Sequence, residues 1–291
     1  MLIMASDLRK ETPRPTLDDL KAYLDGLVAQ FEQPTFIQDD PIAIPHGFDD
    51  PRDQEVIGLY AAILAWGRRT TILKKMEEFC ERMRYRPYRF VRDFDEGRDA
   101  SRLATFKHRT FQPLDALWFT KNLGEALRRH ETVERFFAAH LPEDAADVGA
   151  AIQGFSEGMM TMAPGTPSRL RKHLARPASG SACKRLCMYL RWMVRSGPVD
   201  LGIWPMIRPD QLVLPLDVHS GRQARALGMI ARTANDWLAA LELTRQCQRL
   251  CPDDPARYDF ALFGVGAYNI SLDERFTGSN VFASTSSPTL R

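Results

Sequence analysis

Long apolar runs are missing from this chain of 291 residues. No stretch approaches the roughly 20 apolar residues that a helix needs to cross a bilayer. The N-terminus reads MLIMASDLRKE, so charged residues follow a short apolar start that is unlike a secretory signal. We therefore expect a cytoplasmic protein with no membrane partner.

Cysteine is scarce, and its spacing does not fit the common metal motifs. The five cysteines are Cys80, Cys183, Cys187, Cys247 and Cys251. An odd number without an export signal indicates reduced thiols. Two i,i+4 pairs could place thiolates on one helix face, but no CxxC spacing and no paired histidine accompanies them. We favour small buried apolar side chains, and we expect no metal, no iron–sulfur cluster and no other cofactor.

Sustained alternation of apolar and polar β-branched residues is also absent, and a helical period dominates the chain. The composition is 44% hydrophobic and 26% charged, which is ordinary for a globular protein and excludes global disorder. The length suits one large domain or two lobes that share an interface. We predict an all-α fold.

The helical pattern can be followed along the chain. Thr16 is a suitable N-cap for a helix over 17–31, whereas 33–53 holds four prolines and is expected to form an ordered loop. Polar tails are expected over 1–16 and 271–291, around a single domain over 17–270. Further helices are predicted over 54–67, 68–84, 113–129, 132–140 and 147–160.

The net charge of +2 hides a strong asymmetry. Residues 166–232 contain twelve Lys and Arg but only three acids, which gives this segment a charge of +9 and leaves −7 for the remainder. Phosphate neutralisation supplies most of the non-specific affinity for DNA. The segment is therefore a candidate polyanion-binding face, and the alternative is a solvated basic surface without a partner.

One lysine in this basic segment begins an apolar helix. SACKRLCMYLRWMV follows the turn RPASG, so Ser181 is the expected N-cap and Lys184 falls in the first helical turn. The positive end of the helix dipole and burial both disfavour the ammonium form there. Lys184 is thus a candidate amine nucleophile, and the same helix start can receive a phosphate through its amides.

An aspartate begins the next helix. In VLPLDVHSGRQARALG, Asp217 is placed to cap the helix, and backbone hydrogen bonds would keep its carboxylate ionised and fixed in direction. A fixed carboxylate can stabilise the positive charge that grows on a sugar when its glycosidic bond breaks. Capping alone is an equally ordinary role for such a residue.

These features together resemble the helix-hairpin-helix DNA glycosylase superfamily, which includes endonuclease III and the 8-oxoguanine glycosylases. Its members carry a catalytic aspartate in V-D-T-H or V-D-V-H, and bifunctional members place a lysine nucleophile after the hairpin. By this resemblance Lys184 matches the nucleophile and Asp217 the aspartate, and Pro215 and His219 stand in flanking positions.

The separation of 33 positions between Lys184 and Asp217 is similar to that in the archaeal 8-oxoguanine DNA glycosylase branch. Over about residues 34–268 the chain also resembles a little-characterised bacterial family with segments like KRLCMYLRWMVR, VDLGIW, PLDVHSGR and DPARYDFALFGVG. The hairpin departs from the superfamily pattern, because PASGSACK replaces L-P-G-V-G and holds a single glycine. The cluster-binding cysteines of endonuclease III are absent after Gly266.

The resemblance implies a two-lobed helical bundle with a cleft that binds double-stranded DNA. It implies a monomeric bacterial base excision repair enzyme, acting at the nucleoid as a glycosylase and abasic-site lyase. The expected substrate is a damaged base, an oxidised purine such as 8-oxoguanine.

Further residues receive roles from this reading. The residues expected to contact DNA are Gly180, Ser181, Arg185, Arg191, Arg222, Arg225, Arg68 and Arg69. The residues expected to line a base pocket are Gln54, Trp66, Trp204, His219 and Phe263. Tryptophans in such patterns are commonly core residues, which is the alternative for Trp66 and Trp204.

Two other functions remain open from the sequence. One is a DNA-binding or damage-sensing protein that has the same fold but no catalytic activity. The other is an unrelated all-α scaffold whose basic patch binds RNA or a protein partner.

Overall fold

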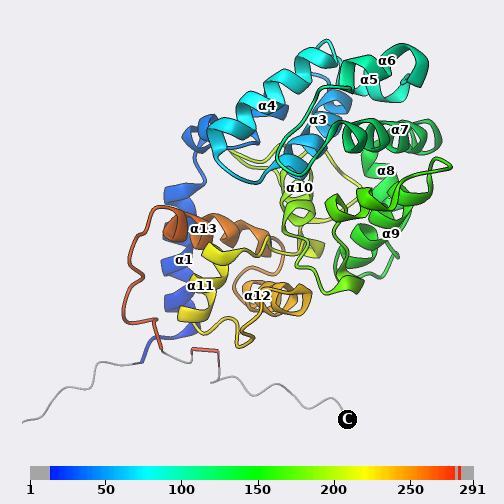
Figure 1. Ribbon diagram of the computed structural model, residues 1–291. Coiled ribbons are helices and arrows are strands. Elements are labelled where there is room, and N and C mark those ends of the chain that lie inside the picture. Colours follow the sequence, from blue (N-terminus) through cyan, green and yellow to red (C-terminus); the bar gives the residue numbers. More distant parts are fainter. Residues whose placement is uncertain (1–13, 279–280, 283–291) are drawn as a thin grey trace, which may run out of the picture.

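The structure, a computed structural model, describes residues 14–278 and 281–282 (Figure 1). Helices form its whole framework: the described residues contain no β-strand, only three isolated bridges between single residues. The all-α prediction is confirmed. Apolar residues at helical spacing bury one face of each helix, and the helices pack on these faces.

One group of helices surrounds α3 (Pro51–Leu64), whose residues from Glu55 to Leu64 are all buried. A helix that is apolar on most sides needs neighbours all round, and α3 packs against helices that come both before and after it in the chain. This group (Figure 1) also contains α4 (Arg69–Arg82), α5 (Pro87–Arg92), α6 (Glu96–Leu103), α7 (Pro113–His130), α8 (Val133–Ala138) and α9 (Gly149–Thr161).

A second group is built around α13 (Tyr258–Ala267), which packs against α1 (Leu17–Phe31) and α11 (Val218–Ala226). The fourth helix of this group is α12 (Trp237–Leu250). Between the two groups runs α10 (Lys184–Val194), which contacts α3 (Figure 1). Helices α1 and α13 therefore lie beside each other although they are more than 200 residues apart in sequence.

The helix starts follow from local chemistry. Thr16 caps α1 as expected, since its Oγ1 accepts from the backbone N–H of Asp19 at 3.1 Å and the Asp19 carboxylate accepts from the N–H of Thr16. Helices appear in each of the further segments where they were predicted. Their ends differ from the predicted ends by a few residues, which is usual where helix ends fray.

The prediction of an ordered loop over 33–53 is wrong in detail. It folds into a 3-10 helix, η1 (Pro34–Asp39), and a short helix, α2 (Ala43–His46), and α3 already begins at Pro51. Proline breaks a helix only in the interior, and at the first position its fixed φ and missing N–H are tolerated. The remaining 3-10 turns are η2 (Ser168–His173), η3 (Pro177–Ser179), η4 (Pro209–Gln211) and η5 (Pro255–Arg257).

The two expected tails fall partly outside the described residues, which exclude 1–13, 279–280 and 283–291. The described part of the second tail does not fit a purely polar tail. Phe276 is buried, and its ring stacks on Tyr23 of α1 with 5.1 Å between centroids. Within the described chain no helix is long and apolar enough to cross a membrane.

Candidate functional site

The loop before α10 turns sharply and then starts the helix without a side-chain cap. Gly180 (φ 76°) and Cys183 (φ 50°) both adopt left-handed conformations, and Cys183 is the N-cap residue. The prediction of Ser181 as N-cap is therefore wrong. Its Oγ accepts from the N–H of Cys183 at 3.2 Å instead, so Ser181 shapes the turn one step earlier. Lys184 is the first helical residue.

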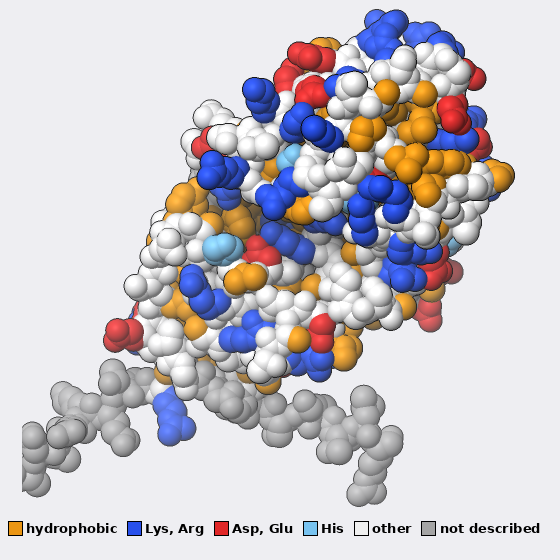
Figure 2. All heavy atoms as spheres, in the orientation of Figure 1, with side chains coloured by type: hydrophobic (Ala, Val, Ile, Leu, Met, Phe, Trp, Pro, Cys, Tyr) orange, Lys and Arg blue, Asp and Glu red, His pale blue; other side chains and the backbone are white. Residues whose placement is uncertain are grey.

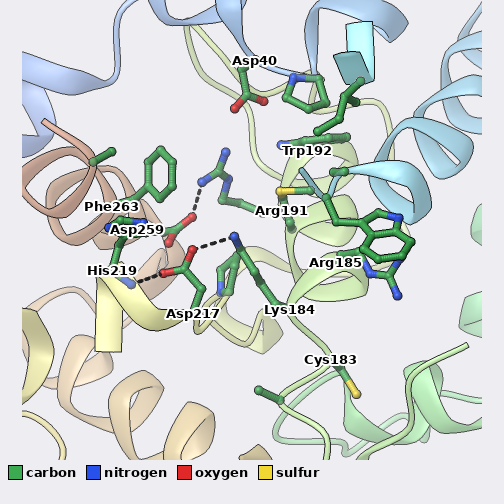
Figure 3. Close-up of a pocket in the computed structure, with 18 of the residues that line it drawn as sticks. Asp40, Cys183, Lys184, Arg185, Arg191, Trp192, Asp217, His219, Asp259 and Phe263 are labelled. Carbon is green, nitrogen blue, oxygen red and sulfur yellow. Dashed lines mark hydrogen bonds and ion pairs between the residues drawn. The ribbon is translucent and has the colours of Figure 1, made fainter. Parts of the chain in front are cut away.

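Lys184 and Asp217 meet at the centre of the molecule. Lys184 Nζ donates to Asp217 Oδ2 at 2.7 Å, although the two residues are 33 positions apart (Figure 3). The side chains are 37% and 15% exposed, respectively, so the pair is open to solvent on one side. A nucleophile and a partner that can take its proton need this hydrogen-bond contact. The structure brings the two predicted residues together.

The second carboxylate oxygen of Asp217 is fixed by the helix it caps. Oδ1 accepts from the backbone N–H groups of His219 at 2.8 Å and Ser220 at 2.9 Å. Burial opposes ionisation of the carboxyl group. The charge and hydrogen bond of Lys184 and the two helix amides outweigh this effect and lower the pKa of Asp217 below its ordinary value. Asp217 is therefore an oriented anion.

Two glycines allow α11 to lie close to its neighbours, which sets the position of Asp217. A Cβ on Gly266 of α13 would lie 2.9 Å from Cβ of His219, and one on Gly221 would lie 2.7 Å from Asn235 Oδ1. Side chains at these two positions would push α11 away from its support. Asn235 also donates to the carbonyl oxygen of Asp217 at 2.9 Å, which holds the start of α11 from the other side.

The Lys184–Asp217 pair faces a cavity of about 820 Å³ between the two groups of helices (Figure 3). Pockets of this size hold small organic ligands, and this one is large enough for a nucleoside. Its walls come from α10, α11, α13, the start of α4 and the segment before α2. Of the residues predicted from sequence, the lining includes Trp66, Arg69, Ser181, Lys184, Arg185, Arg191, Asp217, His219 and Phe263.

An aromatic wall stands beside the lysine. Lys184 Nζ lies 5.9 Å from the ring centroid of Phe263, and the Arg69 guanidinium lies 5.6 Å from the same centroid. Phe36 of η1 packs edge-on against Phe263 at 6.2 Å. A partly exposed ring flanked by two cations can stack a flat ligand next to an anionic backbone.

Trp66 closes another part of the cavity. The Arg109 guanidinium lies 4.9 Å from its ring centroid, and the ring of His108 packs edge-on against it. Its buried Nε1–H has no hydrogen-bond partner among the described residues. His219 also lines the cavity, where its Nδ1 lies 3.2 Å from the carbonyl oxygen of Gly266.

Arg191 is buried, which contradicts its predicted role as a DNA phosphate contact. Its Nε donates to Asp200 at 3.2 Å and its Nη1 donates to Asp259. Arg195, one turn further along α10, bonds Asp200 and Asp254. We call these two arginines, with Asp200, Asp254, Asp259 and Glu32, the buried ion network. Guanidinium groups so enclosed cannot reach a phosphate outside.

Two further residues that were predicted to contact DNA form hydrogen bonds within the protein instead. The Arg185 guanidinium donates to the carbonyl oxygen of Ile63 near the end of α3. Arg225 donates to the carbonyl oxygens of Arg232 and Ala234 and to the side chain of Asn235. Both guanidiniums satisfy backbone carbonyls that would otherwise lack donors, so their first role is to hold loops.

Four predicted contacts remain available on the surface. Gly180, Arg68 and Arg222 are exposed and Ser181 is half-buried, and all four lie on segments that border the cavity. Figure 2 shows Lys and Arg side chains spread around the central hollow of this face. The arrangement is a ring of separate cations rather than one continuous patch.

Two predicted pocket residues lie elsewhere, and their assignment is wrong. Gln54 sits near the start of α3, where its amide donates to the carbonyl oxygen of Phe48. The cavity touches Ala65, eleven residues later and thus about 16 Å further along the axis. Trp204 is a core residue whose Nε1 donates to Glu55 at 3.1 Å while its ring packs on Phe137 and Tyr189.

Comparison with known proteins identifies the family. The family model described as "Protein of unknown function (DUF2400)" matches residues 40–268. The chain belongs to this family. No curated protein and no solved structure matches the chain. The matched segment contains the Lys184–Asp217 pair and most of the residues that line the cavity.

Sequence reasoning missed two carboxylates of this DUF2400 site. Asp259 lies one turn before Phe263 on α13, a spacing that places both on one helix face. Burial raises the pKa of Asp259 to about 6 against the opposing charge of Arg191. Asp40 lies between two helical turns in a proline-rich segment, where no periodic pattern marks it as a site residue.

No metal site is formed by the described residues, among which no three His, Cys, Asp or Glu side chains gather suitably. The interpretation of the spaced cysteines as apolar core residues is confirmed for Cys183, Cys187 and Cys247, which are buried, while Cys251 is half-buried.

Proposed function

We propose that this protein is a DNA glycosylase with abasic-site lyase activity, acting on a damaged base in double-stranded DNA. The observation that carries the proposal is the 2.7 Å contact between Lys184 Nζ and Asp217 Oδ2 at the mouth of a nucleoside-sized cavity. An oxidised purine such as 8-oxoguanine is the substrate that the sequence resemblance favours.

In the proposed reaction the Asp217 carboxylate first stabilises the positive charge that grows on the sugar as the base departs with the electrons of the glycosidic bond. Lys184 Nζ then gives a proton to Asp217 Oδ2, and the neutral amine forms a bond to the anomeric carbon. Opening of the sugar ring then gives a Schiff base, and elimination releases the 3′ phosphate.

The cavity suits a nucleotide that has left the duplex. Flipping a base costs a few kcal/mol, and less when the base is damaged or mispaired. Stacking on Phe263 offsets part of this cost, since one base–aromatic stack is worth about 1–3 kcal/mol. In this proposal the exposed Arg68 and Arg222 hold the flanking phosphates.

The rest of the proposal follows from DNA as the substrate. The two groups of helices act as two lobes with DNA bound across the gap between them, and the protein works as a monomer on the chromosome in the cytoplasm. The uncapped start of α10 adds free backbone amides beside Lys184 that suit a phosphate oxygen.

A trapping experiment tests the proposal. The protein is incubated with an abasic duplex, and separately with an 8-oxoguanine duplex, in the presence of borohydride, which reduces a Schiff base to a stable link. The wild type is expected to form a covalent protein–DNA adduct, and Lys184→Ala is expected to form none.

Lys74→Ala is the matched control, because Lys74 is an exposed lysine on α4 that does not line the cavity. An adduct that persists in Lys184→Ala removes the lysine from the mechanism. DNA binding without any adduct or base release supports instead a protein that only senses damage.

A further inference from the structure

A buried carboxylate with no ion-pair partner projects into the cavity across from the Lys184–Asp217 pair. Asp40 is 8% exposed, lines the cavity, and forms no ion pair among the described residues. One oxygen, Oδ1, accepts from the backbone N–H of Ile42 at 3.1 Å; this is the only hydrogen bond of the carboxylate in the described chain. In Figure 3 the carboxyl group points into the cavity toward Arg191.

Two hydrogen-bond donors lie on the same side of the cavity. The bonds of Arg191 to Asp200 and Asp259 use Nε and Nη1, so neither of these carboxylates engages Nη2. Trp192 also lines the cavity, and its buried Nε1–H has no partner among the described residues. Buried polar groups are nearly always satisfied, so an unsatisfied one such as Trp192 Nε1 at the cavity wall indicates a ligand.

The spacing along α10 fits a nucleoside. Lys184 and Arg191 are seven residues apart, so they are separated by about 10 Å along the helix axis. A nucleoside with its anomeric carbon at Lys184 therefore extends its base toward Asp40 and Arg191. The edge of the base that pairs in the duplex then meets these two side chains.

We propose that Asp40 determines specificity by reading a guanine-type base. Its carboxylate accepts two adjacent N–H groups, the ring N1–H and the 2-amino group, while the neighbouring base carbonyl accepts from Arg191 or Trp192. Among the common bases only guanine and its derivatives offer an acceptor followed by two donors along this edge. Hypoxanthine has no 2-amino group, and uracil and thymine place an acceptor on each side of one N–H.

Electrostatics agree with this role. Burial raises the pKa of the Asp40 carboxyl, against the smaller opposing effects of the Ile42 amide and the charges of Arg191, Arg69 and Lys184. An unpaired buried carboxylate is costly, and two N–H donors from a base relieve that cost. The pocket is thus suited to discriminate between bases by hydrogen bonding, because loss of a donor on the ligand weakens binding more than a change of shape does.

The inference rests on the proposed glycosylase function, and the test separates the two. Asp40→Asn keeps an oxygen that can accept from Ile42, so the local turn is preserved. Asp39→Asn is the matched control, because it removes the same charge from the adjacent, exposed residue. Single-turnover base excision is measured on duplexes that contain 8-oxoguanine or 8-oxohypoxanthine, which differ only in the 2-amino group.

The wild type is expected to excise 8-oxoguanine faster than 8-oxohypoxanthine. Asp40→Asn should slow excision of 8-oxoguanine by about tenfold to hundredfold and abolish the preference. Adduct formation on an abasic duplex should stay at the wild-type level, since no base is present to be read. An Asp40→Asn protein with the wild-type preference, or a wild type with none, overturns the role of Asp40.

If the proposed function is wrong, the wild type itself forms no covalent adduct with the abasic duplex. Calorimetric titration with free nucleosides then still decides the inference. Tighter binding of 8-oxo-2′-deoxyguanosine than of 8-oxo-2′-deoxyinosine, lost in Asp40→Asn but kept in Asp39→Asn, supports it. Equal binding of the two nucleosides by the wild type contradicts it.

Discussion

The two ends of α10 carry charged groups in opposite environments. At its start, Lys184 pairs with one carboxylate and remains 37% exposed at a cavity. Near its end, Arg191 of α10 and Arg195, the residue that follows α10, lie in the buried ion network with side chains about 5% exposed. Both arrangements join α10 to the group of helices around α13, but only the first leaves a reactive atom accessible.

The difference shows that one helix carries an accessible ion pair at its start and a buried, supporting network at its end. The buried ion network fixes α10 against α13 and η5, because each guanidinium is held by carboxylates from different segments. That rigid half positions the first turn of α10, where in the proposed reaction Lys184 releases Asp217 and reaches a sugar. Near-contact geometry on a rigid frame is what such a reaction requires.

Breaking the buried ion network should have the largest effect on stability. Arg191→Met leaves Asp259 without its cation and weakens the hold on Asp200, so we expect the free energy of unfolding to fall by about 3–5 kcal/mol. Urea denaturation followed by circular dichroism measures it. Lys184→Met is the comparison on the same helix, and its half-exposed pair should contribute no more than about 1 kcal/mol. Equal losses would remove the distinction between the two ends.

Altering the Lys184–Asp217 pair should affect the proposed reaction rather than stability. Asp217→Asn keeps a side-chain oxygen that can cap α11 but removes the negative charge beside the sugar. We expect base excision to slow by about 10²–10³-fold with little change in the unfolding midpoint. Single-turnover excision is the measurement. A large loss of stability with unchanged chemistry would make Asp217 a structural cap only.

Glu55 extends the comparison, because it is a buried carboxylate that forms no ion pair among the described residues. Burial raises its pKa to about 7, against hydrogen bonds from the amides of Val133 and Glu134 and from Trp204. The folded state therefore binds the Glu55 proton more tightly than the unfolded chain, whose value is near 4.5. Its contribution to stability is expected to decline as the pH rises from about 4.5 to about 7 and to level off above that.

Glu55→Gln should remove this contribution to the pH dependence. The measurement is the urea midpoint of both proteins at several pH values from 5 to 8. Other buried groups titrate in both proteins alike, so the difference between the two curves isolates Glu55. Parallel curves would show that Glu55 keeps its charge throughout.

The smallest effect is expected at the outer rim of the site. Arg222 is exposed, so Arg222→Ala should make the slope of log affinity against log salt shallower by about 0.9, with equal weakening for all DNA sequences. Arg89→Ala on the distant α5 is the control and should leave the slope unchanged. Fluorescence anisotropy of a labelled duplex over a salt series measures both. An unchanged slope in Arg222→Ala takes this residue out of the DNA contact.

The basic segment over 166–232 shows why sequence charge is a poor guide to a surface. Its +9 balance counts Arg169, Arg191 and Arg195 as free cations. The structure pairs Arg169 with Asp115 and the other two with acids that lie mostly outside the segment. Acids distant in sequence neutralise part of the excess, which no local count can reveal.

The sequence by itself determined the helical class, most helix positions and the two residues at the centre of the site. Apolar spacing and caps such as Thr16 act within a few residues, so they can be read locally. Lys184 and Asp217 stood out because each begins a helix.

Only the tertiary structure decided which side chains meet. It placed Asp40 and Asp259 at the cavity, removed Gln54 and Trp204 from it, and turned Arg191 inward. The physical reason is that burial and ion pairing depend on neighbours from distant segments. A buried charge is stable only where a partner arrives from elsewhere in the fold.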